Sequence, residues 1–348
     1  MGGPMNPGRS RITIRDVAAR VGVHPSTVSR VLNPATRGRI TPEIVDKVTR
    51  AARKLGYTPN QAAQGLRTSR SRTVGVLIPD ITNPIFPPII RGIEDALGSA
   101  GYTAILGNTD NLASRERSAV ANMRARQVDG LILATARRND PTVAQCVADR
   151  LPVVLVNRSA ETDGVSTVLT DDALGIARAV DHLRSLGHRE IAHIAGPRSI
   201  STGALRRQSF IDAMADAGLS PTPELIAETK AFSESEGLRA ASALIGGSAR
   251  FTAIVAANDL LALGAYDALR NAGLVCPDDV SVTGFNDMPF VDRLTPPLTT
   301  IRIPQYELGR EAARRLIQLI EMPDMPAGTI ILRPELIVRG STTAPNGR

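Results

Sequence analysis

The stretch ITIRDVAARVGVHPSTVSRVL, residues 12–32, decides the fold of the N-terminal part of this 348-residue chain. Its first half carries apolar residues at the i, i+3, i+4, i+7 spacing of one helix face, at Ile14, Val17, Ala18 and Val21. Its second half carries an apolar set of its own, at Val28, Val31 and Leu32. Two short amphipathic helices are therefore expected in close succession.

Capping residues mark where these two helices begin and end. Thr13, followed three residues later by Asp16, predicts a capping box at the start of the first helix. Gly22 ends that helix, because glycine adopts the left-handed conformation at little steric cost. Pro25 suits the first turn of the second helix, where its missing N–H is not needed. The pattern predicts a helix-turn-helix, a motif that can enter a DNA major groove.

The outer face of the second helix combines small hydroxyl side chains with an arginine. Small residues allow close approach to DNA, and Arg30 could bind a guanine edge with two hydrogen bonds. The predicted DNA-contacting residues of this region are Thr13, His24, Pro25, Ser26, Thr27, Ser29 and Arg30. Taken alone, the stretch could also be a structural helical hairpin, because short motifs often match by chance.

Two longer stretches extend the pattern. DVAARVGVHPSTVSRVLN (16–33) and TPEIVDKVTRAARKLGYTPNQAAQGLRTSRSRTVGVLIPD (41–80) resemble the lactose-repressor (LacI/GalR) family of bacterial transcription regulators, and the resemblance continues to the C-terminus. It implies a three-helix DNA-binding domain followed by a two-lobed domain like that of periplasmic binding proteins. A small-molecule effector would then bind in the cleft between the lobes.

Charge is strongly segregated along the chain. Residues 1–72 hold fourteen Lys and Arg against three Asp and Glu, a net charge of +11, whereas the whole chain carries +7. The remaining residues therefore carry a net charge of −4. A basic head on a mildly acidic body is typical of a protein whose head alone binds the phosphate backbone.

Other features of the sequence indicate a cytoplasmic protein. No apolar run approaches the length of a membrane span, and the N-terminus lacks the apolar core of a signal peptide. Cys146 and Cys276 show no metal-ligand spacing and are expected to be two buried thiols. We expect neither a metal nor a cofactor.

The predicted organisation has four parts. A flexible arm (1–11) precedes the DNA-binding domain (12–58), in which 33–40 is a loop and Thr41 begins a third helix that ends near Leu55. A hinge helix and linker (59–72) lead to the effector-binding and dimerisation domain (73–348). Its first lobe is expected at 73–169 and 301–333, and its second at 170–300 and 334–345.

The segment 59–67 is compatible with a helix but too short to be stable alone. The family resemblance implies a hinge helix that folds against its dimer mate in the minor groove, with Leu66 wedged into a base step. Asn60, Ala63 and Arg67 would lie in the same groove. The alternative is that Leu66 packs on the effector-binding domain. Its polar and basic neighbours in the sequence make this packing less favourable.

From residue 73, apolar strand-like runs alternate with amphipathic helices in two series. Such alternation predicts an α/β fold, with parallel sheets covered by helices on both faces. The first series has strands near 73–80, 102–108, 130–135 and 152–157, and the second near 190–196, 227–232, 253–258 and 280–285. A return segment (296–303), a helix (304–320) and two final strands complete the domain.

Ligands of such folds bind beyond the carboxyl ends of the strands. Amides, carboxylates and an arginine near aromatic rings follow several strands and suit a sugar or a nucleoside. Strand-end position or the family resemblance gives the candidate effector-binding residues Phe86, Thr135, Thr202, Arg206, Phe232, Asn258 and Asn286. Asn286 departs from the carboxylate that relatives often have there, which makes a cationic ligand doubtful. Asp259 and Asp287 are open to a purely structural role as helix caps.

His24 is a second departure, because relatives usually have a small hydroxyl residue at that position. Histidine caps helices poorly, so we expect a looser helix end or a contact with DNA. Because histidine titrates near ~6.5, DNA affinity could depend mildly on pH.

The sequence favours a regulator, most simply a repressor, that binds a palindromic operator as a homodimer. An enzyme would need an acid and a base facing the substrate, and no nucleotide-binding loop, HExxH or GxSxG motif is present. A solute-binding transport protein fits the two lobes but not the basic head.

Overall fold

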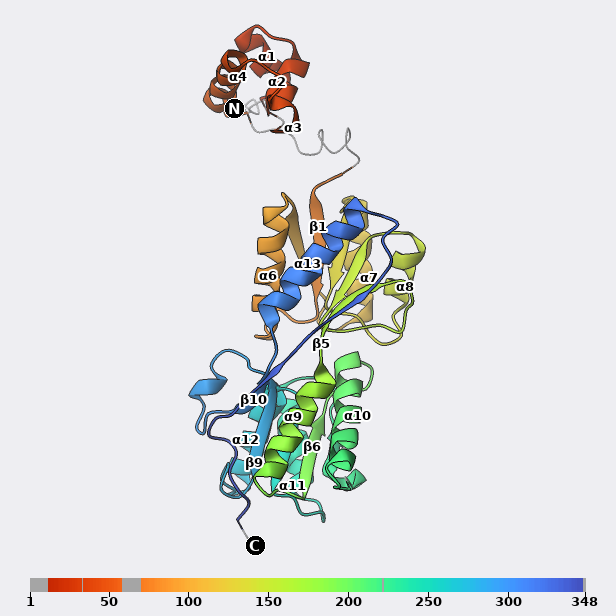
Figure 1. The fold of residues 1–348 in the computed structure, drawn as a ribbon, viewed down its shortest axis with the longest axis vertical. Helices are drawn as coiled ribbons and strands as arrows, with labels where there is room; N and C mark the ends of the chain where they lie inside the picture. Colours follow the sequence, from red (N-terminus) through yellow and green to blue (C-terminus); the bar gives the residue numbers. More distant parts are fainter. Residues whose placement is uncertain (1–11, 33, 58–69, 221, 347–348) are drawn as a thin grey trace, which may run out of the picture. The chain divides into compact units, whose positions relative to one another are not determined.

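The computed structural model describes residues 12–32, 34–57, 70–220 and 222–346 (Figure 1). The chain divides into two units, residues 1–71 and 72–348. Each unit has a hydrophobic core of its own. We refer to them as the head and the body.

The head is built from helices. They are α1 (Ile14–Val21), α2 (Pro25–Leu32), α3 (Pro34–Arg37) and α4 (Pro42–Leu55). The apolar faces of α1, α2 and α4 form one core, made of Val17, Ala18, Val28, Val31, Val48 and Ala52. The expectation of a loop throughout 33–40 is wrong in one respect, because this segment contains the single helical turn α3. Pro34 favours a helical start there, since its φ is already fixed near the helical value.

The first lobe of the body is a six-stranded sheet in the order β2-β1-β3-β4-β5-β11, with every pairing parallel. Its strands are β1 (Thr73–Ile78), β2 (Thr103–Asn108), β3 (Gly130–Leu133), β4 (Val153–Val156), β5 (Ser166–Thr170) and β11 (Thr329–Leu332). Helices α6 (Phe86–Ser99) and α13 (Gln305–Glu321) cover one face of the sheet, and α7 (Ala113–Ala125) and α8 (Pro141–Ala148) cover the other (Figure 1).

The second lobe repeats this plan in the order β7-β6-β8-β9-β10-β12, in which only the β10–β12 pairing is antiparallel. Its strands are β6 (Ile191–Ala195), β7 (Ile226–Glu228), β8 (Ala253–Ala256), β9 (Ser281–Asn286), β10 (Thr299–Arg302) and β12 (Glu335–Ile337). Its helices are α9 (Asp172–Ser185), α10 (Ser201–Asp216), α11 (Glu234–Ile245), α12 (Asp259–Asn271) and the short 3₁₀ turns η1 (Pro223–Leu225) and η2 (Val291–Arg293).

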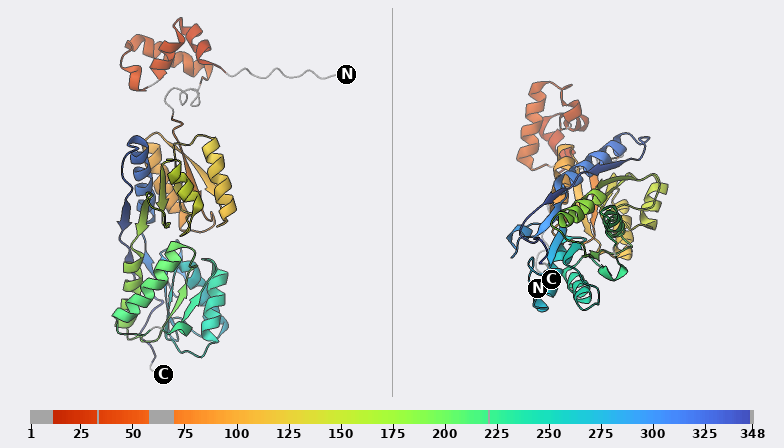
Figure 2. Two further views of the ribbon diagram at one scale, coloured as in Figure 1. Left: turned by 90° about the vertical axis from the view of Figure 1, so that its right-hand side faces the viewer. Right: turned by 60° about the horizontal axis from the view of Figure 1, so that its bottom comes forward.

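The chain passes between the two lobes three times (Figure 2). It leaves the first sheet after β5, returns between β10 and α13, and leaves again between β11 and β12. Strand β10 pairs with β9 through Arg302, so the second passage lies after the expected boundary at 300/301. Neither lobe is a single segment of the sequence.

Glycines bring helix backbones together in both lobes. A Cβ on Gly309 of α13 would lie 1.9 Å from the Ile89 carbonyl oxygen of α6, and a Cβ on Gly92 of α6 would lie 2.0 Å from a carbonyl oxygen of α13. Gly237 and Gly264 allow the same close approach between α11 and α12. Each lobe therefore has one helix pair whose spacing requires residues without a side chain.

The α/β prediction is confirmed, with two corrections. Strand β5 was not expected, because Ser and Thr interrupt its apolar residues. The strand expected at 227–232 is β7, which ends at Glu228. Cys146 is buried as expected, but Cys276 is only partly buried. No helix in the described ranges has the length and apolar character needed to cross a membrane.

Candidate functional site

The first helix of the head begins as the sequence predicts. The backbone N–H and the hydroxyl of Thr13 both donate to the Asp16 carboxylate, at 2.7 and 2.8 Å. These bonds lower the pKa of Asp16 from its usual value. Gly22 ends α1 in the left-handed conformation, with φ of 74°. The turn between α1 and α2 is thus set by local interactions.

The expectation of a poorly capped second helix is wrong. The Nδ1 atom of His24 accepts the backbone N–H of Ser26 at 3.2 Å and lies 2.7 Å from the Ser26 hydroxyl oxygen. The imidazole therefore supplies the acceptor that a hydroxyl side chain usually supplies at a helix start. The ring therefore stabilises the N-terminal end of α2.

The outer face of α2 is open to solvent at Ser26 and Arg30. Ser26 and Arg30 are exposed, and Pro25, Thr27 and Ser29 are partly buried. The same helix anchors itself through Val28 and Val31, which lie in the head core. The predicted contacts Asn60, Ala63, Leu66 and Arg67 lie outside the described residues.

The body brings six of the seven predicted effector-binding residues to one cavity of about 20 Å³ between the lobes, the inner cavity. They come from the start of α6, from α10, from the segment after β7 and from the ends of β8 and β9. These residues are Phe86, Thr202, Arg206, Phe232, Asn258 and Asn286. The carboxyl ends of parallel strands converge there, as expected for a doubly wound fold.

Arg206 is the most constrained of the six. Its Nη2 donates to Asp172 at 3.0 Å and its Nη1 donates to the Ala257 carbonyl at 2.8 Å. Its guanidinium also stacks 3.7 Å from the ring centroid of Phe285. Burial raises the pKa of Asp172, and the attraction of Arg206 opposes that rise. The arginine is held in one orientation at the wall of the inner cavity.

The two asparagines differ in how much of each side chain is engaged. Asn258 caps α12, because its Oδ1 accepts the Leu261 N–H at 2.9 Å. Asn258 also lines the inner cavity. Asn286 has a positive φ of 119°, and its buried Oδ1 has no hydrogen-bond partner among the described residues. An unsatisfied amide beside a cavity suits a hydroxyl-bearing ligand.

Thr135 does not line the inner cavity. Its hydroxyl donates to the buried Glu116 carboxylate, and burial raises the pKa of Glu116. Its carbonyl lies 3.4 Å from Nη1 of Arg158. Thr135 is therefore placed behind the cavity wall.

Arg158, which was not among the predicted residues, lines the inner cavity with Asn83, Ile85 and Asn157. Its two terminal nitrogens lie 3.3 and 3.2 Å from the Asn111 amide oxygen. Burial lowers its pKa to about 10. Asn157 and Arg158 directly follow β4, so the strand-end rule applied to that strand would have found them.

Two strand-end acids have structural roles, although neither is the helix cap that the sequence left open, since Asn258 caps α12 and Phe290 precedes η2. Asp259 accepts hydrogen bonds from the Met288 N–H and the Thr300 hydroxyl, and burial raises its pKa to about 7. Asp287 forms ion pairs at 2.7 Å with both Arg302 and Arg339. Neither carboxylate lines the inner cavity.

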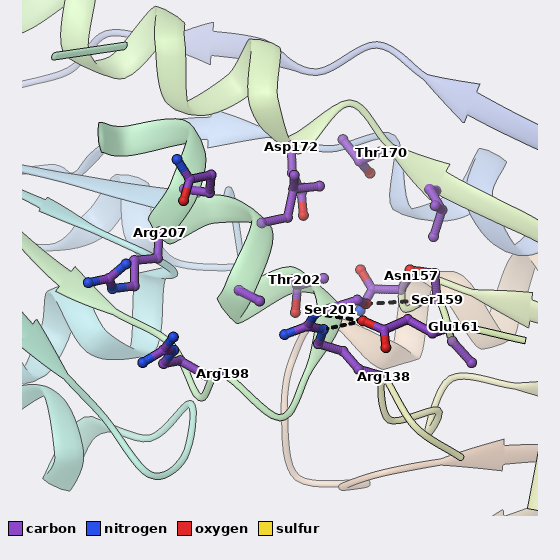
Figure 3. Close-up of a pocket in the computed structure, with 15 residues that line it drawn as sticks. Arg138, Asn157, Ser159, Glu161, Thr170, Asp172, Arg198, Ser201, Thr202 and Arg207 are labelled. Carbon is purple, nitrogen blue, oxygen red and sulfur yellow. Dashed lines mark hydrogen bonds and ion pairs between the residues drawn. The ribbon is translucent and has the colours of Figure 1, made fainter. Parts of the chain in front are cut away.

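A larger cavity of about 430 Å³, the outer cavity, lies beside the inner one and shares Asn157 and Thr202 with it (Figure 3). The lobes meet at its edge, where the Ser159 N–H donates to the Ser201 hydroxyl at 2.9 Å. Figure 3 shows its charged residues, which are Arg138, Glu161, Asp172, Arg198 and Arg207. Within the described residues, no group of three His, Cys, Asp or Glu side chains could hold a metal ion.

A helix-turn-helix head joined to a two-lobed body with a polar cleft defines a ligand-binding transcription regulator. Residues 13–60 match the model of bacterial regulatory proteins of the lacI family, and 180–342 match the periplasmic binding protein-like domain. The chain is 32% identical to the transcriptional repressor CytR of Escherichia coli K12, with 95% of this chain and 96% of that protein covered. It is 34% identical to the ribose operon repressor of the same strain, with 94% and 99% covered. The chain belongs to the lacI family of bacterial regulatory proteins.

Solved structures agree with this assignment. The lac repressor dimer bound to operator and the anti-inducer ONPF has a TM-score of 0.87 at 28% identity, with 96% of this chain and 100% of that chain covered. A lacI-family regulator from Enterococcus faecium with bound ribose has a TM-score of 0.69 at 31% identity, with 79% and 100% covered. DNA-binding transcriptional regulation is therefore the function of the class to which this chain belongs.

Proposed function

We propose that this protein is a repressor that binds a palindromic operator as a homodimer and responds to a sugar or nucleoside-like effector. The observation that carries the effector role is the convergence of Phe86, Arg206, Asn258 and Asn286 on one cavity between the lobes. An effector bound there would touch both lobes and so change how they meet. Such coupling is typically about 1–3 kcal/mol, enough to change operator occupancy severalfold or more.

In the head, Arg30 and Ser26 are the side chains that we assign to base readout, because both are exposed on α2. The hinge at 59–72 would enter the minor groove, with Asn60, Ala63, Leu66 and Arg67 beside the DNA. Operator binding places the protein in the cytoplasm, on the nucleoid.

We also propose that the cleft binds its ligand without turning it over. Asp172 is paired with Arg206, and Asp259 is occupied by Thr300 and Met288. Of the described residues, no two acids face each other across the inner cavity as a general acid and base would.

Selection from random duplex DNA tests the proposal, with the full-length protein and titrated salt. We expect enrichment of a palindrome with a flexible pyrimidine–purine step at its centre. Arg30→Ala should cost about 1–3 kcal/mol of specific binding, whereas Lys47→Ala, at an exposed residue paired with Glu43 on α4, should not alter the selected sequence. Binding that shows no sequence preference with or without candidate effectors would refute the proposal. Unchanged operator affinity in Leu66→Ala would refute the hinge contact alone.

A further inference from the structure

The cleft contains more arginines than carboxylates that pair with them. The two cavities are lined by five arginines, Arg138, Arg158, Arg198, Arg206 and Arg207. Three carboxylates form ion pairs with members of this set, namely Glu161, Asp172 and Glu228. The five arginines therefore exceed their ion-pairing carboxylates by two positive charges.

The first excess charge arises because two arginines share Glu228. Arg198 and Arg207 approach the same carboxylate oxygen at 3.6 and 3.4 Å. The Nε of Arg207 is buried and makes no hydrogen bond within the described residues, because the contact with Glu228 lacks the geometry for one. Figure 3 shows Arg198 and Arg207 on the same side of the outer cavity. Together, the two guanidinium groups can therefore bind a second anion in addition to Glu228.

Arg158 is the second excess charge. Its acceptors are the Asn111 amide oxygen and the Thr135 carbonyl, and no described carboxylate forms an ion pair with it. The acid that acts on Arg158 electrostatically is Glu116. Its carboxylate accepts a hydrogen bond from the Thr135 hydroxyl, and burial raises its pKa and so disfavours its anionic form. The positive charge of Arg137 also acts on Arg158 and contributes to lowering its pKa. Arg158 therefore contributes positive potential to the cleft.

Cavity size shows where a ligand has room. The inner cavity measures about 20 Å³, whereas the outer cavity, at about 430 Å³, lies within the usual range for small-molecule pockets. The amide of Asn157 and the hydroxyl of Thr202 lie where the two cavities meet, and the hydroxyl of Ser201 lines the outer one. A sugar ring can thus hydrogen-bond these groups while a charged substituent lies in the outer cavity.

We propose that the effector is an anionic sugar, a monosaccharide that carries a carboxylate or phosphate group, and that Arg198 and Arg207 bind this group in the outer cavity. Asn157, which lines both cavities, fits this assignment, because an amide does not repel an anion as a carboxylate would. The inference rests on the proposed function, since it names the ligand of the same cleft.

Calorimetric titration of the full-length protein tests the inference with matched probes: ribose against ribose 5-phosphate, and glucose against gluconate and glucose 6-phosphate. We expect at least one anionic probe to bind about tenfold or more tightly than its neutral parent. The comparison of gluconate with glucose 6-phosphate shows which anionic group is preferred. The affinity should fall as salt rises.

Variants identify the binding site. Arg207→Gln should lower the affinity for the anionic probe about tenfold or more and leave that of the neutral parent unchanged. Arg207→Lys should recover part of the loss, and equal melting temperatures without ligand show that the variants are folded. The matched control is Arg270→Gln, at an exposed ion pair with Asp267 on α12.

Three results would overturn the inference: tighter binding of the neutral parent, equal effects of Arg207→Gln and Arg270→Gln, or no binding of any anionic probe at millimolar concentration. A neutral sugar that binds and alters operator affinity would leave the proposed function intact while removing this inference. An anionic sugar that binds in the cleft without altering operator affinity would do the reverse.

Discussion

Replacing Arg206 by Met tests the most tightly built contact of the cleft. The side chains of Arg206 and Asp172 are only 3% and 5% exposed, and they pair at 3.0 Å. Methionine would keep the apolar contact with Phe285 but leave the Asp172 carboxylate buried without its cation. Breaking a buried pair in this way costs about 3–5 kcal/mol. We therefore expect Arg206→Met to lower the free energy of unfolding of the body by that amount at neutral pH.

The pH dependence of this loss has a definite sign. Burial already raises the pKa of Asp172, and removal of Arg206 removes the main opposing effect. An acid with a higher pKa in the folded state stabilises the fold below its unfolded pKa, and this stability is lost as the pH rises through the folded value. The cost of Arg206→Met should thus be larger at pH 8 than at pH 5.

Urea unfolding followed by circular dichroism measures the effect, with the double variant Asp172→Asn/Arg206→Met as control. The double variant should be more stable than Arg206→Met, because it no longer buries an unpaired charge. A loss below about 1 kcal/mol in Arg206→Met, or a double variant no more stable than the single one, would refute this account of the pair.

Three further predictions concern other parts of the chain. Gly309→Ala would place a Cβ 1.9 Å from the Ile89 carbonyl oxygen and should lower the free energy of thermal unfolding by about 1–3 kcal/mol. The control is Gly98→Ala in α6, where a Cβ meets nothing within 4 Å, and this change should be neutral or stabilising. Equal effects of the two changes would contradict the packing of α13 against α6. His24→Ala removes the hydrogen-bond acceptor at the start of α2 and should lower the free energy of unfolding of the head by about 0.5–2 kcal/mol. His24→Asn should restore most of that loss. An alanine variant as stable as the unchanged protein would show that the cap is unimportant. Burial lowers the pKa of His193 to about 4, so the contribution of His193 to stability is present above its unfolded pKa and is lost as the pH falls toward 4. His193→Gln should therefore reduce the loss of unfolding free energy between neutral and acid pH. An unchanged dependence of the unfolding free energy on pH would exclude this role.

The sequence predicts the head well because its signals are local. Thr13, Asp16 and Gly22 act within a few residues of their own position, and the structure places them in the expected roles. His24 shows the limit of such reasoning. A residue that is usually a poor cap becomes an adequate one when its Nδ1 meets the Ser26 N–H, and that depends on a side-chain rotation that no pattern encodes.

The cleft could be predicted only in part, because it is assembled from distant segments. Strand ends and the family resemblance located six of its residues, but the strand-end position of Thr135 did not reveal that its hydroxyl turns toward Glu116. Arg158 also follows a strand end, but its orientation toward the cleft depends on Asn111, which lies 47 residues earlier in the chain. That Arg198 and Arg207 share a carboxylate depends on where Glu228 lies at the end of β7, which only the folded chain shows.

The three passages between the lobes restrict how this protein can be cut or recombined. Helix α13 and strand β11 belong to the first lobe but are encoded after the second-lobe strands β6 to β10. A gene fragment that ends before residue 305 would therefore encode a first sheet without its edge strand and without the helix that packs against α6. To graft a new effector specificity by exchanging one contiguous segment, both breakpoints would have to fall within the second lobe, between residues 172 and 302.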